Sequence, residues 1–294
     1  MHRLVFLLTI LSLVILNCSS TIQAQGLLSA VSDESRAGSA PSSSSDDEKD
    51  DDDDDDDHHN SHSSHGSSHG HYDGAGVMMG LYATGVVVTS PYWIPIAITG
   101  DDYTQPGLFQ RFPNDITSGY MLKGEEWSQL GKPFSIRAST EYGTDFNNLS
   151  RSGTKFLIEG THGWGLDTQW NQYFEDVPAG GTDELTTGDI NVVFRFAESY
   201  FAQFRTGLGV NMLSDQVGTE WGLNFTYGAD IYPCDNVIWS SELDLGKVGT
   251  ASFFNIRTTA GLQWKRAEIF GGFQHTNYEG TELNGLITGI RLWF

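Results

Sequence analysis

The sequence predicts an all-β fold: a closed, antiparallel, up-and-down β-barrel of about ten strands behind a disordered amino-terminal arm. The first observation behind this prediction is an alternation of apolar and polar side chains, with a period of two, from Pro133 to the end of the chain. The second is that every charged side chain within the proposed strands falls on one face. The third is the last stretch, Leu286 to Phe294, in which Leu286, Ile290, Leu292 and Phe294 share a face.

The first 24 residues have the features of a secretory signal peptide. Arg3 precedes an apolar run from Leu4 to Leu16, and the small residue Ala24 lies at the expected cleavage point. Cys18 leaves a lipoprotein signal open as an alternative. After cleavage at Ala24 only Cys234 remains, so that no disulfide can form within the mature chain.

Residues 25–75 form a low-complexity arm with fourteen acidic and two basic side chains, including the run Asp50 to Asp57. Such a segment has almost no apolar surface to bury and is expected to be disordered. Its imidazoles predict weak binding of divalent metal without a folded site; the alternative is a solvated linker with incidental histidines. No other cofactor is expected. The candidate ligands are His58, His59, His62, His65, His69 and His71.

Residues 76–132 form a connector before the barrel. The apolar part, Gly76 to Thr99, is about long enough to span a bilayer, but Pro91 and Pro95 interrupt a helix. We therefore expect a short apolar helix or an extended segment on the periplasmic side that plugs or docks on the barrel. A transmembrane helix is the alternative. Residues 100–132 show no clear period.

Residues 133–294 carry the barrel. The alternation predicts strands at 133–146, 152–161, 164–174, 186–197, 200–213, 219–232, 236–246, 250–264, 267–277 and 284–294. Eight strands is the alternative, if 152–174 is one bent strand. Turns at 161–164, 198–199, 233–235 and 265–266 alternate with longer connections at 147–151, 175–185, 213–218, 247–249 and 278–283. Short turns on the periplasmic side and longer loops outside are typical of membrane barrels.

The two faces of the strands differ in charge. One face is apolar and aromatic, whereas the other holds every strand charge: Arg137, Glu141, Asp145, Lys155, Glu159, Asp167, Asp189, Arg195, Arg205, Glu220, Asp230, Glu242, Asp244, Arg257, Glu268 and Arg291. In a soluble barrel or sandwich the apolar face would be the core. In a transmembrane barrel that face meets lipid and the charges line the lumen. We favour the transmembrane version because the chain is exported, the charged face has both signs and many glycines, and aromatic residues cluster near strand ends.

A lumen of about ten strands is largely filled by its own side chains, so that buried charges must be paired. We expect an ion-pair network that occludes the barrel; a narrow pore lined by charge is the alternative. The predicted members are Arg137, Glu141, Glu159, Asp167, Arg195, Arg205, Asp230, Glu242, Asp244, Arg257 and Arg291.

Catalysis and nucleic-acid binding are not expected. Within the barrel His162 falls at a predicted periplasmic turn and His275 falls on the apolar face, so that neither joins the acidic outer residues Glu175 and Asp183. A rim hydrolase like the omptin proteases, which use Asp and His pairs, is therefore less favoured. The formal net charge of −22 argues against binding phosphate backbones.

The alternation over residues 133–294 and the terminal aromatic Phe294 resemble a small bacterial outer-membrane β-barrel protein. The resemblance implies export to the outer membrane of a Gram-negative-type bacterium, contact with its lipid, and recognition of Phe294 by the barrel-insertion machinery. Phe204 to Leu213 (FRTGLGVNML) and Leu283 to Phe294 also resemble uncharacterised exported proteins of planctomycete-type bacteria, which carry no assigned activity.

The sequence thus predicts an outer-membrane protein with a structural or surface-interaction role and a weakly metal-binding acidic arm. A narrow porin-like channel is the alternative.

Overall fold

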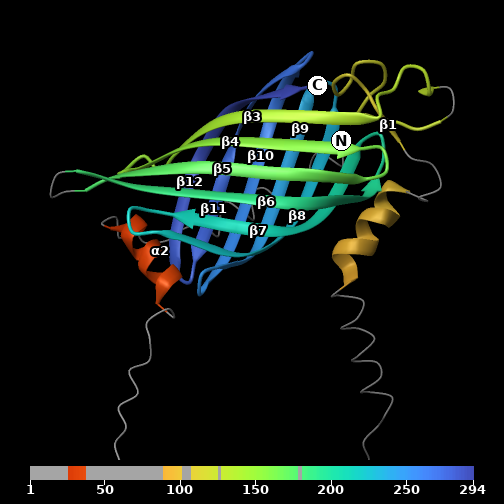
Figure 1. Cartoon of the computed structure of the whole chain (residues 1–294). Helices are drawn as coiled ribbons and strands as arrows, with labels where there is room; N and C mark the ends of the chain where they lie inside the picture. Colours follow the sequence, from red (N-terminus) through yellow and green to blue (C-terminus); the bar gives the residue numbers. More distant parts are fainter. Residues whose placement is uncertain (1–25, 38–88, 101–106, 125–126, 178–180) are drawn as a thin grey trace, which may run out of the picture. The chain divides into compact units, whose positions relative to one another are not determined.

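The barrel was analysed in a computed structural model, which describes residues 26–37, 89–100, 107–124, 127–177 and 181–294. Ten antiparallel strands form a closed barrel in which each strand pairs with its neighbours in sequence and β12 pairs with β3 (Figure 1). The strands are β3 (Phe134–Thr144), β4 (Leu149–Gly160), β5 (Trp164–Asp176), β6 (Thr182–Glu198), β7 (Ala202–Ser214), β8 (Thr219–Cys234), β9 (Val237–Val248), β10 (Ala251–Trp264), β11 (Ala267–Tyr278) and β12 (Thr281–Trp293). The predicted fold class and the count of ten strands are confirmed.

Three short elements precede the barrel. Helix α2 covers Leu27–Arg36, and β1 (Leu108–Phe109) pairs with β2 (Met121–Leu122) in a separate two-stranded sheet. Residues 89–99 form a further helix. None of the helices within the described ranges has the length and apolarity needed to cross a membrane. The predicted signal peptide and all six histidines of the arm lie outside the described residues.

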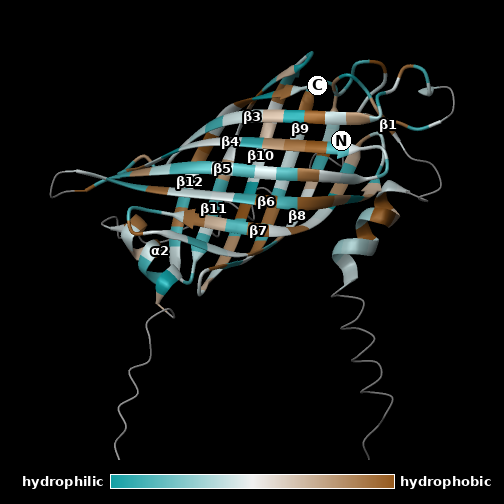
Figure 2. Cartoon of the chain, viewed as in Figure 1, coloured by the Kyte–Doolittle hydropathy of each residue, from teal (hydrophilic) through white to brown (hydrophobic). Residues whose placement is uncertain are grey.

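The charged face of the strands points into the barrel. Arg205 is 4% exposed and Asp230 is 0% exposed, whereas Leu208, on the opposite face of β7, is 68% exposed. Colouring by hydropathy shows the same alternation along the strands (Figure 2). The alternation therefore assigned the two faces correctly. The alternative arrangement, with the aromatic residues in the core and the charged residues on the outside, is excluded.

The predicted long loops are shorter than expected. Residues 152–174 are two strands, joined by a turn at 161–163, and β5 and β6 stay paired as far as Asp176 and Thr182. The sequence prediction ended β5 at residue 174 and assigned residues 175–185 to a connection. In the structure Glu175 faces inward, where the amides of α2 satisfy its carboxylate, and the strand pairing continues.

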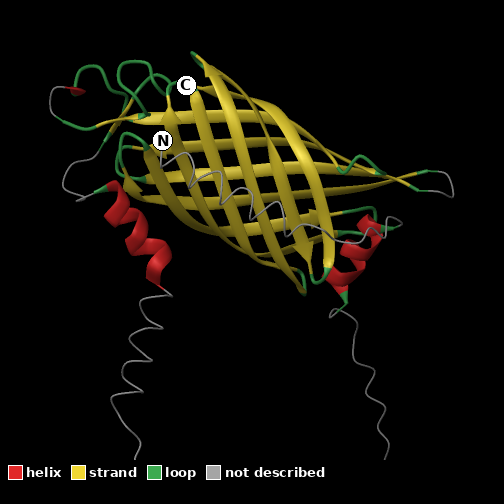
Figure 3. Cartoon of the chain, turned by 180° about the vertical axis from the view of Figure 1, so that it is seen from behind, coloured by secondary structure: helices red, strands yellow, loops and turns green. Residues whose placement is uncertain are grey.

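The two ends of the barrel are distinct. One rim, which we call the turn end, carries the connections 161–163, 199–201, 235–236 and 265–266. The opposite rim, which we call the loop end, carries the connections 145–148, 177–181, 215–218, 249–250 and 279–280. Figure 3 shows the closed wall of strands from behind. An apolar cluster fills each end of the lumen. Helix α2 belongs to the loop-end cluster, whereas β1 and β2 belong to the turn-end cluster, so that they lie at opposite ends of the barrel.

Candidate functional site: a sealed lumen

The middle of the lumen is filled by paired charges. Asp230, on β8, accepts hydrogen bonds from Arg137 at 2.8 Å and from Arg205 at 2.6 Å. Ser240, on β9, donates to the other carboxylate oxygen at 2.6 Å. A single carboxylate thus joins strands β3, β7 and β9 across the barrel, and its charge is fully compensated.

A second set of pairs lies toward the seam between β3 and β12. Glu141 accepts from Arg151 at 2.5 Å and is also paired with Arg257. On β11, Glu268 accepts from Arg291 at 2.8 Å and from the indole Nε1 of Trp293 at 3.0 Å. These bonds hold the two seam strands to their neighbours from inside the barrel.

Lys155 and Arg195 hold the remaining pairs. Lys155 pairs with Asp167 at 3.2 Å and also with Glu242. Arg195 pairs with Glu159 at 3.2 Å and with Glu198 at 2.5 Å. A register shift between residues 195 and 197 brings both Arg195 and Glu198 inward, because an extra residue in one strand reverses the later alternation.

The structure brings ten of the eleven predicted network residues into ion pairs. The eleventh, Asp244, accepts a hydrogen bond from Asn255 at 2.8 Å instead. The prediction omitted four partners: Arg151 and Glu198, which it placed in connections, and Lys155 and Glu268, which it placed on the charged face only.

Helix α2 seals the loop end. Leu28 and Val31 are buried in a cluster with seven inward residues of the barrel: Leu149, Tyr173, Leu185, Leu213, Val248, Tyr278 and Leu283. The first turn of the helix meets Glu175, whose carboxylate accepts from the backbone amides of Gly26 and Leu28 at 3.1 and 3.0 Å. A carboxylate at this position satisfies amides that have no partner within the helix and favours its positive end.

The last turn of α2 is held by a second acidic residue. Arg36 donates to Asp215 in the β7–β8 connection through two nitrogens, at 2.7 and 2.8 Å, and Ser32 also donates to this carboxylate. The Arg36 guanidinium holds the pKa of Asp215 well below its usual range. The carbonyl of Ser35 accepts from the amide of Thr250 at 2.9 Å. Both ends of the helix are therefore fixed to the rim, within a segment that was expected to be disordered.

Residues 107–124 seal the turn end. Phe109, Tyr120 and Met121 pack against Trp293 and Ile238, and the rings of Tyr120 and Trp293 lie edge to face with centroids 5.0 Å apart. The docking was expected of Gly76 to Thr99, whereas the segment that packs on the barrel comes from residues 100–132, which were expected to be a connector without regular structure.

One glycine fixes this seal. Gly119 has a φ of 89°, and a Cβ at this position would overlap the carbonyl oxygen of Tyr200. Gln110 donates to the carbonyl of Gly119 at 3.1 Å and so holds the turn from within.

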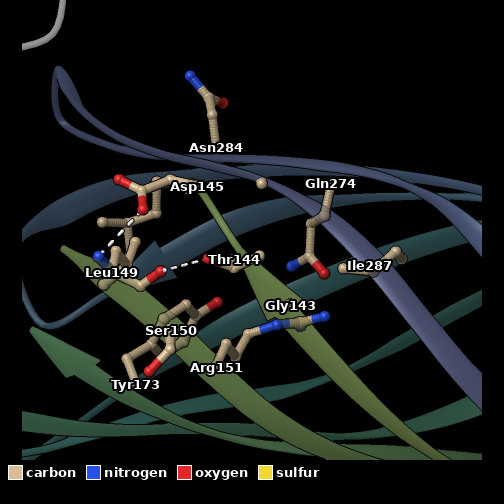
Figure 4. A pocket seen from close by; sticks show the side chains of 12 residues that line it. Gly143, Thr144, Asp145, Leu149, Ser150, Arg151, Tyr173, Gln274, Asn284 and Ile287 are labelled. Atoms are coloured by element: carbon tan, nitrogen blue, oxygen red, sulfur yellow. Dashed lines mark hydrogen bonds between the residues drawn. The ribbon is translucent and has the colours of Figure 1, made fainter. Parts of the chain in front are cut away.

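Between the seals the lumen contains small cavities. One of about 20 Å³ lies near the loop end against β3 and β12, with Arg151, Tyr173 and Gln274 around it (Figure 4). Two others of about 20 Å³ lie beside the Lys155 pairs and beside Asp189 and Asp244. A space of this size holds about one water molecule. A larger hollow of about 550 Å³ lies outside the turn end, beside Lys123 and Tyr200.

The two histidines of the barrel do not converge on a catalytic or metal-binding group. His162 lies in the turn at 161–163, and His275 points outward from β11 beside Asn284. Within the described ranges no three His, Cys, Asp or Glu side chains are grouped to hold a metal ion. Phe294 continues the last strand: its amide donates to the carbonyl of Ile136 at 2.8 Å.

No protein-family model matches the chain, and no curated protein matches it. Among solved structures, the outer membrane protein Ail of Yersinia pestis, in a phospholipid bilayer nanodisc, matches 54% of this chain and 99% of its own, with 14% identity and a TM-score of 0.32. The KdgM porin matches the same shares with 13% identity and a TM-score of 0.28. CdiB from Acinetobacter baumannii matches 54% of this chain and 39% of its own, with 9% identity and a TM-score of 0.27.

At these values the likeness concerns the barrel fold and carries no argument about function. The resemblance to exported planctomycete-type proteins finds no support in these comparisons.

Proposed function

We propose that this chain is an outer-membrane β-barrel that is closed to solutes and serves a structural or surface-interaction role. One observation carries the proposal: an apolar face, with charged residues only at its loop end, surrounds a charged interior that has apolar seals at both ends. In water such an outer face would expose a large apolar surface, which soluble proteins avoid. In a bilayer the same face is solvated by lipid.

The distribution of outward residues supports this placement. The charged residues on the outer face of the strands, Asp176, Glu184, Lys247 and Glu282, all lie at the loop end. Exposed aromatic residues stand near both rims, as girdles of a membrane barrel do: Phe134, Trp164, Tyr200, Trp264 and Phe294 at the turn end, and Tyr142, Trp170 and Trp221 toward the loop end. The outer face of the strands is therefore apolar over a band between the two rims, as expected of a barrel that contacts lipid.

The filled lumen favours the structural role over the porin-like channel. A solute would have to cross the turn-end seal, the ion pairs around Asp230 and Glu242, and the seal formed by α2. Opening the middle layer would leave buried charges without partners, at a cost of several kcal/mol for each of them, about 3–5 in measured cases. The interaction surface is then the outside of the rims.

Two further parts of the proposal rest on sequence alone. The arm with His58, His62 and the other histidines would hold divalent metal weakly near the envelope. Phe294 would be read by the barrel-insertion machinery. Titration of a peptide over residues 42–72 against a His-free scramble tests the first part, and export of a Phe294→Ser variant tests the second.

Membrane fractionation followed by an unboiled detergent gel tests the main proposal. We expect the chain in the outer-membrane fraction, with a mobility that changes on boiling. Purified protein in a planar bilayer should give no steady conductance. Recovery in the aqueous fraction would contradict the membrane placement, whereas channels of defined size would contradict the closed state.

A further inference from the structure

A small cavity in the loop-end half of the lumen has no role in the closed barrel described above. Its volume is about 20 Å³. Carboxylate and amide groups from six strands reach it, from Asn171, Asp189, Asn211, Asp244, Asn255 and Gln274, and none of the residues that line it is basic. The cavity therefore has carboxylate and amide groups in its lining, beside apolar side chains such as Met212 and Val248, and no basic residue.

Two of these residues, Asp189 and Asp244, are acids without a counter-charge. The nearest lysine of the lumen, Lys155, is committed to Asp167 at 3.2 Å and to Glu242. Neither Asp189 nor Asp244 forms an ion pair with any basic side chain in the described part of the chain. An isolated buried charge is costly, so the carboxylates of Asp189 and Asp244 require a bound proton or a positive charge from a ligand.

Hydrogen bonds favour the ionised form of Asp189. A chain of amides leads to it, in which each side-chain nitrogen donates to the next oxygen: Asn211 to Asn224 at 3.3 Å, Asn224 to Asn191 at 2.9 Å, and Asn191 to Asp189 at 2.8 Å. An amide N–H donated to a carboxylate stabilises its charged state, which is the state that a bound metal ion requires.

A second chain leads to Asp244 from the other side of the barrel. Gln274 donates to Asn255 at 2.9 Å, and Asn255 donates to Asp244 at 2.8 Å. The carbonyl oxygen of Gln274 then has no hydrogen-bond partner, although the residue is only 6% exposed. Gln274 thus lines this cavity together with the two carboxylates, and it also lines the cavity beside Arg151.

We propose that this cavity binds one Ca²⁺ ion. Calcium prefers carboxylate and amide oxygens and water, tolerates irregular geometry, and carries the charge that two unpaired carboxylates require. Asp189 and Asp244 supply the charge, Gln274 supplies a neutral oxygen, and water completes the shell. A cavity that holds one water-sized sphere also accommodates one ion. Zinc does not fit, because the site offers neither thiolate nor imidazole.

Unfolding of the full-length protein in detergent tests the proposal, because a ligand that binds only the folded barrel raises its midpoint. Because the lumen is closed, the protein is unfolded and refolded in EGTA or in Ca²⁺ and then melted, with NaCl at equal ionic strength as the reference. At saturating Ca²⁺ we expect the midpoint to rise by about 5 °C. Asp244→Asn and Asp189→Asn should abolish this response and should melt above the wild type in EGTA, since they remove an unpaired charge.

A variant with serine in place of Asp50–Asp57 separates this site from the acidic arm and should keep the full response to Ca²⁺. No response in the wild type, an equal shift with NaCl, or loss of the response in the arm variant would each overturn the proposal. Analysis of retained metal provides a second readout: the wild type should hold one more Ca²⁺ per chain after desalting than the doubly substituted protein. Equal content in the two proteins would mean a shared proton instead of an ion.

Discussion

The backbone amide of Leu28 donates to the carboxylate of Glu175 at 3.0 Å, so that the last residues of β5 hold the first turn of an amino-terminal helix. The bond is buried, and the same carboxylate also accepts from Gly26 and Leu27. This contact joins two parts of the chain that are 147 residues apart and defines how the loop end is closed.

Glu175→Gln should loosen helix α2 without unfolding the barrel. The amide keeps one acceptor but loses the charge, at a cost of about 1–2 kcal/mol for a buried bond to a charged group. Hydrogen exchange of the amides of residues 26–36 should then become about tenfold faster. Glu184→Gln, an exposed neighbour on β6, is the matched control. Equal exchange in the two variants would argue against a role for this carboxylate.

Acid should release the other end of α2. Because its partner Arg36 lowers the pKa of Asp215 in the folded state, the stabilisation is fully present above the unfolded pKa of about 4 and is lost as the pH falls through the folded pKa. Protease cleavage near Arg36 should rise below about pH 4 in the wild type. Asp215→Asn should be cleaved faster at neutral pH and should lose the acid response of this contact. An unchanged acid response in the variant would assign it to another group.

Asp230→Asn should destabilise the barrel strongly. The substitution leaves Arg137 and Arg205 buried without their carboxylate, which costs about 3–5 kcal/mol in comparable cases. Urea unfolding followed by the folded band on an unboiled gel measures the change. Asp235→Asn, in the exposed turn between β8 and β9, should behave as the wild type. A midpoint unchanged in Asp230→Asn would mean that the network does not stabilise the fold.

The substitution Leu208→Arg distinguishes a barrel whose outer face contacts lipid from a barrel whose outer face contacts water. The side chain is 68% exposed at the middle of β7, where arginine in a bilayer costs about 2–4 kcal/mol and arginine in water costs almost nothing. Folding into vesicles should therefore be impaired. Val217→Arg, 81% exposed in a connection at the loop end, is the control and should fold normally. Equal folding yields would contradict the membrane placement.

Gly119→Ala should release the turn-end seal, because the new methyl group would overlap the carbonyl of Tyr200 and the positive φ disfavours any side chain. Trypsin should then cleave faster after Arg111 and Lys123. In Gly271→Ala, where the nearest atom lies 3.7 Å from the new Cβ, the rate should be unchanged. Slow cleavage in both variants would mean that residues 107–124 stay docked without this turn.

The sequence was sufficient for the faces of the strands and insufficient for the seals. The alternation places Arg205 and Leu208 on opposite faces of their strand, and the same alternation repeats over ten strands. Once the inward face is chosen, the orientation of every strand residue follows, which is why the lumen residues could be named in advance. Helix α2 was not predicted because a helix of ten residues is too short to be stable alone. It is stabilised only when its apolar residues pack against the rim of the barrel. The inward position of Glu198 depends on a bulge that no local pattern marks.

Helix α2 and strand β1 lie at opposite rims, and residues 38–106 connect them. That stretch includes eight consecutive aspartates, which acyl chains would not admit. In one bilayer-embedded molecule with both seals formed, this stretch would have to cross from one rim to the other, so a filled lumen and a docked α2 set opposite demands on the same chain.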